Sequence, residues 1–308
     1  MTPIWRRLRC VAAVFILPLA GLSACAGVDD DADIHVVVTT NILGDVATQV
    51  LGDQVSVTTL MKPNADPHSF QISAQQATAL AEADLIISNG IGLEEGLQQH
   101  LDRAVAAGAP LFVAGDAVTV LPYQSDDAAG EPDPHFWTDP SQMIAVVDAL
   151  EARVKLIDGI DVDTLAATAN DYRQQLVALD ESMKSSFSTI PPERRALVTN
   201  HHVFGYLAHR YGFAVIGAAI PGGTTLAAPS AADLHDLSEA ISTANVPAIF
   251  AESSQPDRLM QVLAEESGIA VEVVELFTES LTAAGGGAAT YIDMMQVNTQ
   301  RITDSLVG

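Results

Sequence analysis

Three histidines and one glutamate are the side chains of this 308-residue sequence that could do chemistry together. Each follows a run of apolar, β-branched residues that we expect to form a β-strand, and the four are His68, His135, His201 and Glu279. In parallel α/β sheets, ligands bind beyond the carboxyl ends of the strands. Two of the four come from each half of the chain, so a cleft between two lobes could bring them together. Three neutral imidazoles and one carboxylate would then make a four-coordinate site suited to Zn²⁺.

The sequence also predicts the local structure around His135. Residues 133–140 read Asp-Pro-His-Phe-Trp-Thr-Asp-Pro. Asp139 suits a helix N-cap, because its carboxylate can accept hydrogen bonds from the first free N–H groups. Pro140 suits the first helical position, where no N–H is needed. We therefore expect His135 on a rigid turn just before a helix.

Short apolar runs separated by helical patterns predict two α/β lobes with parallel sheets covered on both faces. In the first half we expect strands at 36–40, 55–60, 85–88 and 111–113, and helices at 44–51, 73–82, 94–107 and 140–157. In the second half we expect strands at 196–199, 214–219, 248–251 and 271–276, and helices at 203–211, 231–244, 257–267 and 290–306.

An amphipathic segment, 163–187, separates the two halves. Its apolar residues recur at steps of three and four, which predicts one buried face of a helix about 37 Å long; they are Leu165, Ala169, Tyr172, Leu176, Leu179, Met183 and Phe187. A coiled-coil partner would fit the same stripe, but we favour packing along both lobes. The predicted fold class is α/β: two four-stranded parallel-sheet lobes, 34–157 and 191–308, joined by a long rigid linker helix within 158–190, with a metal site in the cleft between the lobes.

The N-terminus has the features of a secretory signal. Three arginines precede an apolar run at 11–22 that is too short for a lasting membrane span. The run ends in Leu-Ser-Ala-Cys, which resembles the lipobox of bacterial lipoproteins. That resemblance implies a signal peptide at 1–25, a lipid on Cys25, which becomes the first residue after cleavage, and a short acidic tether at 26–33. Cys10 would be removed, which leaves no pair for a disulfide.

The charge of the chain restricts its partners. With 14 Lys+Arg against 39 Asp+Glu, the formal net charge is −25. Such a charge repels nucleic acid and phosphorylated ligands and favours cations. The segment 124–131 is acidic as well, and it could either gather cations weakly or serve as a solvated linker.

Several motifs together resemble the metal-specific solute-binding proteins of bacterial ABC transporters, the cluster A-I family that serves zinc and manganese uptake. The resemblance covers nearly all of the chain after Cys25 and rests on the order and spacing of the segments 66–70, 89–94, 134–140, 201–206, 210–212, 249–252 and 291–295. It implies one metal ion held between two lobes by His68, His135, His201 and Glu279. It also implies a monomeric, extracytoplasmic receptor that delivers Zn²⁺, or alternatively Mn²⁺, to an ABC permease and is not an enzyme.

Two features depart from the family pattern. The fourth ligand is commonly Asp, whereas Glu279 is one methylene longer, so it could either coordinate with a shifted backbone or leave the position to water. Many zinc-binding members carry a His-rich loop before the second ligand, and here the corresponding loop is short and acidic.

Alternative interpretations remain at this point. His202 would be the ligand if the turn after the strand were shifted by one residue, and Glu252 could orient an imidazole from outside the ligand set. Surface or structural positions are expected for the remaining histidines, His35, His100, His209 and His235. If Glu279 were a general base, the same residues could form a secreted zinc hydrolase. A metallochaperone or adhesin without a transporter partner is the third interpretation.

The lipobox generates the first prediction. Replacing Cys25→Ala removes the thiol that would carry the lipid, so the protein should move from the membrane fraction to the soluble fraction. Cell fractionation followed by immunoblotting measures this, and Cys10→Ala is the control that should remain in the membranes. Membrane retention of the mature Cys25→Ala protein would contradict the assignment.

Overall fold

Parallel sheets form in both halves of the chain. The structure is a computed structural model that describes residues 34–124 and 128–307; the predicted signal peptide, Cys25 and the tether lie outside these residues. The first sheet contains β1 (His35–Val38), β2 (Ser56–Thr59), β3 (Leu85–Ser88) and β4 (Leu111–Val113), in the order β2-β1-β3-β4. The second contains β5 (Ala196–Thr199), β6 (Ala214–Ala218), β7 (Ala248–Glu252) and β8 (Glu272–Leu276), in the order β6-β5-β7-β8. All pairs are parallel, as predicted.

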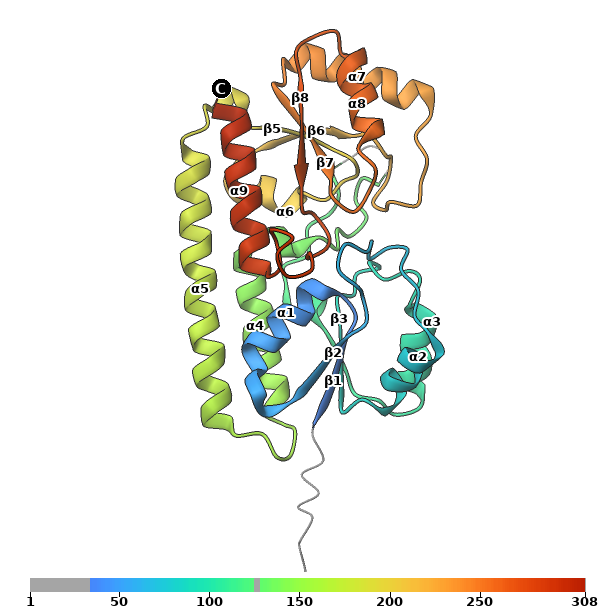
Figure 1. The fold of residues 1–308 in the computed structure, drawn as a ribbon, viewed down its shortest axis with the longest axis vertical. Coiled ribbons are helices and arrows are strands. Elements are labelled where there is room, and N and C mark those ends of the chain that lie inside the picture. The colour runs from blue at the N-terminus through green and yellow to red at the C-terminus, as the bar shows by residue number, and fades with distance from the viewer. Residues whose placement is uncertain (1–33, 125–127, 308) are drawn as a thin grey trace, which may run out of the picture. The chain divides into compact units, whose positions relative to one another are not determined.

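Helices cover both faces of each sheet (Figure 1). The first lobe has α1 (Asn41–Leu51), α2 (Ala74–Glu82), α3 (Gln98–Ala106) and α4 (Pro140–Val154). The second has α6 (Gly205–Tyr211), α7 (Ala231–Ala244), α8 (Arg258–Glu266) and α9 (Tyr291–Val307). Short 3₁₀ turns are η1 (Gly52–Gln54), η2 (Ala114–Ala117), η3 (Phe136–Thr138) and η4 (Pro192–Arg194). None of the helices in the described part of the chain is long and apolar enough to cross a membrane.

The strand order reverses direction at the same point of each sheet. After β1 the chain moves to β2 on one side and then crosses to β3 on the other, and β5, β6 and β7 repeat this arrangement. The order therefore reverses between β1 and β3 and between β5 and β7. Ligands of open α/β sheets bind outside the carboxyl ends of strands at such points.

The third helix begins later than predicted. We expected a helix from residue 94, but α3 begins at Gln98. Residues 94–97 form only a turn, closed by the Leu97 N–H donating to the Glu94 carbonyl oxygen at 3.0 Å, and they follow a loop in which Gly90 and Ile91 have φ of 78° and 54°. Glu94 instead accepts hydrogen bonds from the backbone N–H of Asn89 at 2.6 Å and of Gly90 at 3.1 Å. The glutamate holds this loop in place and takes no part in the helix.

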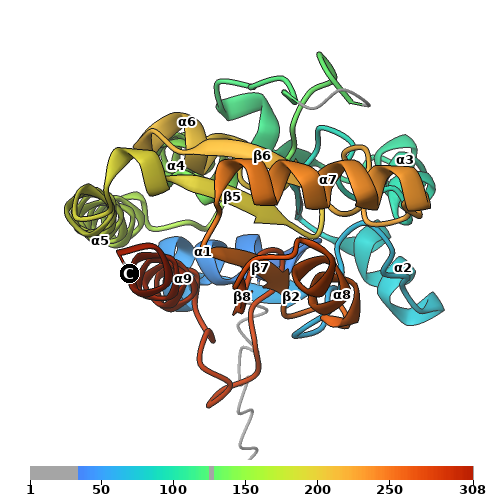
Figure 2. The same cartoon turned by 90° about the horizontal axis from the view of Figure 1, so that it is seen from above.

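A 27-residue helix, α5 (Val162–Ser188), joins the lobes, which confirms the linker helix predicted from the apolar stripe. The side chain of Asp161 caps its N-terminus by accepting from the N–H of Asp163 at 3.1 Å. All seven residues of the stripe are buried. They face α1 and α4 of the first lobe and α9 of the second, and Figure 2 shows α5 and α9 side by side. The stripe thus packs along both lobes, with no coiled-coil partner needed among the described residues.

One hydrophobic cluster runs through both lobes. Alternation along the strands sorts the side chains: Val36 and Val38 face the cluster shared with α5, whereas Val37 faces α2 and α3. In the second lobe Leu197 faces the shared cluster and Val198 faces α7 and α8. The described residues of both lobes accordingly form one compact unit.

Hydrogen bonds join the lobes on the side of α1 and α9. The Asn41 side chain donates to Ser280 Oγ at 2.8 Å and accepts from the Leu281 N–H at 2.9 Å. The Asp45 carboxylate accepts from the Tyr291 N–H at 2.8 Å. These contacts fix the C-terminal segment that carries Glu279 against the first helix.

The stripe on α5 generates the second prediction. Leu176 is fully buried, while its neighbour Val177 is 46% exposed. Leu176→Ala should lower the free energy of unfolding by about 2–5 kcal/mol, because it removes buried methyl groups and leaves a cavity. Val177→Ala is the matched control and should change it by less than about 0.5 kcal/mol. Urea unfolding followed by circular dichroism measures both, and equal effects would contradict the packing described.

Candidate metal centre

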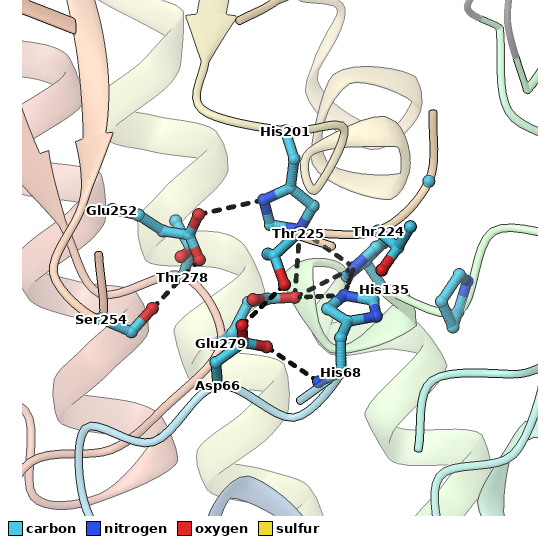
Figure 3. Close-up of polar contacts among 12 residues, drawn as sticks. Asp66, His68, His135, His201, Thr224, Thr225, Glu252, Ser254, Thr278 and Glu279 are labelled. Carbon is cyan, nitrogen blue, oxygen red and sulfur yellow. Dashed lines mark hydrogen bonds and ion pairs between the residues drawn. The ribbon is translucent and has the colours of Figure 1, made fainter. Parts of the chain in front are cut away.

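His68 lies in the loop that follows β2. Its backbone N–H donates to Asp66 Oδ1 at 2.8 Å, which closes a tight turn around Pro67. Ser69 Oγ donates to Asp66 Oδ2 at 3.1 Å. The turn directs the imidazole away from its own lobe and toward Glu279 (Figure 3).

His135 lies just before η3 and α4, on the turn that the sequence predicts. Asp139 caps α4 by accepting from the Ser141 N–H at 2.8 Å, and Pro140 is the first helical residue. The indole of Trp137 donates to the Thr278 carbonyl oxygen at 2.8 Å. This bond holds the His135 turn against the residue that precedes Glu279.

His201 and Glu279 follow β5 and β8 in the second lobe. Thr199 Oγ1 donates to the His201 carbonyl oxygen at 2.6 Å, which fixes the turn after β5. The side chain of Asn298 in α9 makes two hydrogen bonds to the backbone just after β8. It accepts from the Phe277 N–H at 3.0 Å and donates to the Phe277 carbonyl oxygen at 2.7 Å. Both functional side chains are therefore held by short, buried backbone contacts.

The four predicted residues meet at one point (Figure 3). Glu279 Oε1 lies 3.0 Å from Nε2 of His68 and 3.1 Å from Nε2 of His135 and of His201. Nε2 of His135 is 3.4 Å from Nε2 of each of the other two imidazoles. All four residues are at most 1% exposed. Among the described residues, these four are the one group of His, Cys, Asp or Glu placed to hold a metal ion.

These separations match the size of a tetrahedral zinc site. Ligand atoms placed about 2.0–2.2 Å from a central ion at the corners of a tetrahedron lie roughly 3.3–3.6 Å from one another. The distances of 3.0–3.4 Å between nitrogen and oxygen atoms here are slightly shorter. The donor atoms could thus surround one ion with only small movements.

Carboxylates on the far side of two imidazoles set their tautomers. Asp133 Oδ1 lies 2.7 Å from Nδ1 of His135, and Glu252 Oε2 lies 3.0 Å from Nδ1 of His201. Because an ionised carboxylate only accepts, each Nδ1 carries a proton, and in the neutral imidazole Nε2 then presents a lone pair. Outer carboxylates of this kind orient metal-binding histidines.

The centre requires positive charge between its donor atoms. A lone pair on Nε2 facing a carboxylate oxygen at about 3 Å is repulsive unless a proton or a metal ion lies between them. Two buried atoms in the centre, His68 Nδ1 and Glu279 Oε2, have no hydrogen-bond partner among the described residues. The free Oε2 leaves Glu279 able to turn either oxygen, or both, toward an ion.

Protons fill this role without a metal. Burial alone would lower the pKa of His135, but its hydrogen bonds with Asp133 and Glu279 outweigh burial and raise it. Burial is likewise outweighed at His201, where the charges of Glu279 and Glu252 raise the pKa well above 6.5. Burial would raise the pKa of Glu279, yet the surrounding imidazoles hold it well below 4.5. A metal ion has to displace these protons, so binding weakens as the pH falls.

Two histidines outside the centre contact other parts of the fold. His202 is half-buried, and its ring centroid lies 6.4 Å from that of Tyr123, not in the centre. His35 Nε2 lies 2.9 Å from Thr58 Oγ1 within the first sheet. Of the two neighbours in the His-His pair, the structure brings His201 to the centre.

Sequence reasoning missed the role of Asp133. The signal that could have found it is a repeat, since Asp66-Pro67-His68 and Asp133-Pro134-His135 are the same tripeptide. In both copies the first carboxylate accepts from the histidine N–H, at 2.8 and 2.9 Å. Only the second copy also bonds the imidazole.

Known proteins resemble this chain in sequence and in fold. Residues 36–305 match the family described as zinc-uptake complex component A, periplasmic. The chain is 28% identical over 310 residues to the manganese ABC transporter substrate-binding lipoprotein PsaA of Streptococcus pneumoniae, covering 98% of this chain and 99% of the relative. It is 31% identical over 305 residues to the zinc-binding protein TroA of Treponema pallidum, covering 96% and 97%.

Solved structures agree. The periplasmic zinc-binding protein TroA of Treponema pallidum has a TM-score of 0.81 at 30% identity, covering 89% of this chain and 99% of that one. A manganese-bound mutant of a periplasmic metal-binding protein from Candidatus Liberibacter asiaticus has a TM-score of 0.80 at 25% identity, covering 88% and 99%. The chain therefore belongs to the zinc-uptake complex component A family, whose members are not enzymes but the extracytoplasmic metal-binding components of ABC transporters and work with a membrane permease and an ATPase.

Proposed function

We propose that this protein is a Zn²⁺ receptor that binds one ion between its lobes and delivers it to an ABC permease. Its ligands are Nε2 of His68, His135 and His201 and a carboxylate oxygen of Glu279. The observation that supports this most directly is the convergence of three buried Nε2 atoms on one carboxylate oxygen at 3.0–3.1 Å. Such a cluster is stable only with positive charge inside it, and its dimensions are close to those of a four-coordinate ion.

The donor set favours zinc. Imidazole suits Zn²⁺, whereas carboxylate, carbonyl and water oxygens suit Mn²⁺, which prefers six ligands. Here three of the four donors are nitrogen atoms. Asp133 and Glu252 leave the Nε2 lone pairs of His135 and His201 free for a metal, as tetrahedral zinc coordination needs.

Manganese is the second candidate, and one observation supports it. Glu279 Oε2 is buried without a hydrogen-bond partner among the described residues, so it could supply a fifth donor atom. Relatives named for manganese as well as zinc match 96–98% of this chain.

The remaining parts of the proposal concern location. We propose that Cys25 carries a lipid and that residues 26–33 tether the two lobes to the outer side of the membrane as a monomer. Tethering would keep the metal-loaded protein close to its permease.

The proposed metal preference gives the third prediction. Metal-free protein titrated with Zn²⁺ and Mn²⁺ in competition should bind one ion per chain and take up Zn²⁺ more tightly, because nitrogen donors dominate the site. Calorimetry with elemental analysis of the dialysed product measures both the affinity and the stoichiometry. Tighter Mn²⁺ binding would select the second candidate, and two equal sites would refute the proposed site.

Single substitutions give the fourth prediction. His135→Ala should weaken Zn²⁺ binding by more than the roughly 10–100-fold that loss of an outer hydrogen-bond partner costs, because it removes a positioned donor atom. Glu279→Ala should weaken binding less and keep a site, since water can replace a carboxylate oxygen more easily than an imidazole nitrogen. Calorimetry at a single pH compares the two variants.

His202→Ala is the matched control, because His202 adjoins His201 but lies outside the centre. It should bind Zn²⁺ like the unmodified protein, and His201→Ala should not. Loss of binding in His202→Ala with retention in His201→Ala would reverse the assignment within the pair. Unchanged affinity in Glu279→Ala would remove Glu279 from the ligand set.

A further inference from the structure

Two identical Asp-Pro-His turns of the first lobe use their carboxylates differently. Asp133 turns toward the imidazole of its own turn and lies 2.7 Å from Nδ1 of His135. Asp66 turns away from its imidazole, and the Nδ1 of His68 has no hydrogen-bond partner among the described residues. Among the three imidazoles of the centre, His68 is therefore the one whose Nδ1 has no carboxylate partner among the described residues.

Asp66 instead bonds the second lobe. Its Oδ2 accepts from Thr225 Oγ1 at 2.6 Å (Figure 3) and from Gln255 Nε2 at 3.1 Å. Both donors lie in the half of the chain that follows α5. All three residues are half-buried, while His68 beneath them is almost fully buried. The contact is therefore more exposed to solvent than the imidazole beside it.

Each of the two donors, Thr225 and Gln255, lies in a segment of the second lobe that has a further contact with the centre or with the first lobe. Gln255 follows Ser254, whose Oγ donates to Glu252 Oε1 at 3.1 Å, and Glu252 orients His201. Thr225 belongs to the segment between β6 and α7. The same segment is held a second time by the first lobe, because Tyr123 Oη donates to the Gly223 carbonyl oxygen at 2.8 Å.

The same carboxylate also fixes the backbone of the His68 turn through Oδ1. Separation of the lobes would remove two of the donors that hold Asp66. The His68 turn would then be held by contacts within the first lobe, such as the donation from Asn41 Nδ2 to the Lys62 carbonyl oxygen at 3.2 Å. Movement of His68 would withdraw one of the four donor atoms from the centre.

We propose that Asp66, Thr225 and Gln255 form a latch between the lobes that holds His68 in the centre and limits the rate at which bound metal leaves. This inference rests on the proposed function and adds positioning residues to it. The latch residues are not among the four proposed ligands. They act on release by keeping the lobes together over the centre and by keeping the His68 turn in place.

The test is the rate of metal release from the full-length protein loaded with Zn²⁺ and mixed with an excess of a chromophoric chelator. Thr225→Val keeps the shape of the side chain but removes the donor, so release should become roughly tenfold faster, the factor expected for a lost hydrogen bond to a charged group. Gln255→Leu removes the second donor, which follows β7 and bonds Asp66 at the longer distance of 3.1 Å. It should also speed release, by a smaller factor.

Thr224→Val is the matched control. Thr224 lies beside Thr225, and its hydroxyl accepts from the Leu226 N–H at 3.3 Å within its own segment. It should release Zn²⁺ at the unmodified rate. Each variant is also loaded with Co²⁺, whose visible spectrum reports the ligand set and should stay unchanged in all three.

The outcomes separate the latch from the proposed function. Release at the unmodified rate in both Thr225→Val and Gln255→Leu would overturn the latch, and so would equal acceleration in Thr224→Val. A changed Co²⁺ spectrum in Thr225→Val would show that the substitution alters the ligand set of the loaded, closed protein. Faster release would then not come from opening of the lobes, and the latch would be overturned too. If the unmodified protein took up neither Zn²⁺ nor Co²⁺, the proposed function itself would fail.

Discussion

Burial of the Glu279 carboxylate imposes a requirement on every element around it. An ionised carboxylate removed from water loses several kcal/mol unless opposite charge and hydrogen bonds replace the solvent. Glu279 is 1% exposed, and three imidazoles supply its neighbours. Because charge compensation falls off with distance, each imidazole has to stay within about 3 Å. The tight turns, the cap on α4 and the carboxylates behind His135 and His201 serve this one constraint.

The same constraint explains why the lobes are held so differently on their two sides. On the side of α5 they share a hydrophobic cluster, and Asn41 and Trp137 bond the segment that carries Glu279. On the other side, contact includes the hydrogen bonds among the half-buried groups Asp66, Thr225 and Gln255. The first set fixes the positions of the donor atoms. The second set can be exchanged for bonds to water at low cost, so opening of the centre is easiest there.

Much of this could be predicted from the sequence, because the strongest signals were periodic. Short apolar runs gave the strands, the stripe from Leu165 to Phe187 gave α5, and the strand ends placed His68, His135, His201 and Glu279 together. The beginning of α3 could not be predicted, since it depends on Glu94 bonding a loop with positive φ. The repeated tripeptide could have pointed to Asp66 and Asp133 but not to their different roles, because the two copies differ only in what the rest of the fold places beside them. The zinc hydrolase that the residue types left open is excluded by family membership.

The shared cluster along α5 also limits how this architecture can be recombined. Leu197 and Phe250 of the second sheet, Val36 and Val38 of the first, and the buried face of α5 all belong to one cluster. If one lobe were exchanged for that of a relative, its apolar side chains would no longer fit those of the remaining lobe and of α5. Mismatched apolar surfaces would then be in contact at the junction. Chimaeras cut at the ends of α5 would therefore carry packing defects far from the exchanged centre. Metal preference in this architecture is altered with less disruption by changing single donor residues than by exchanging lobes.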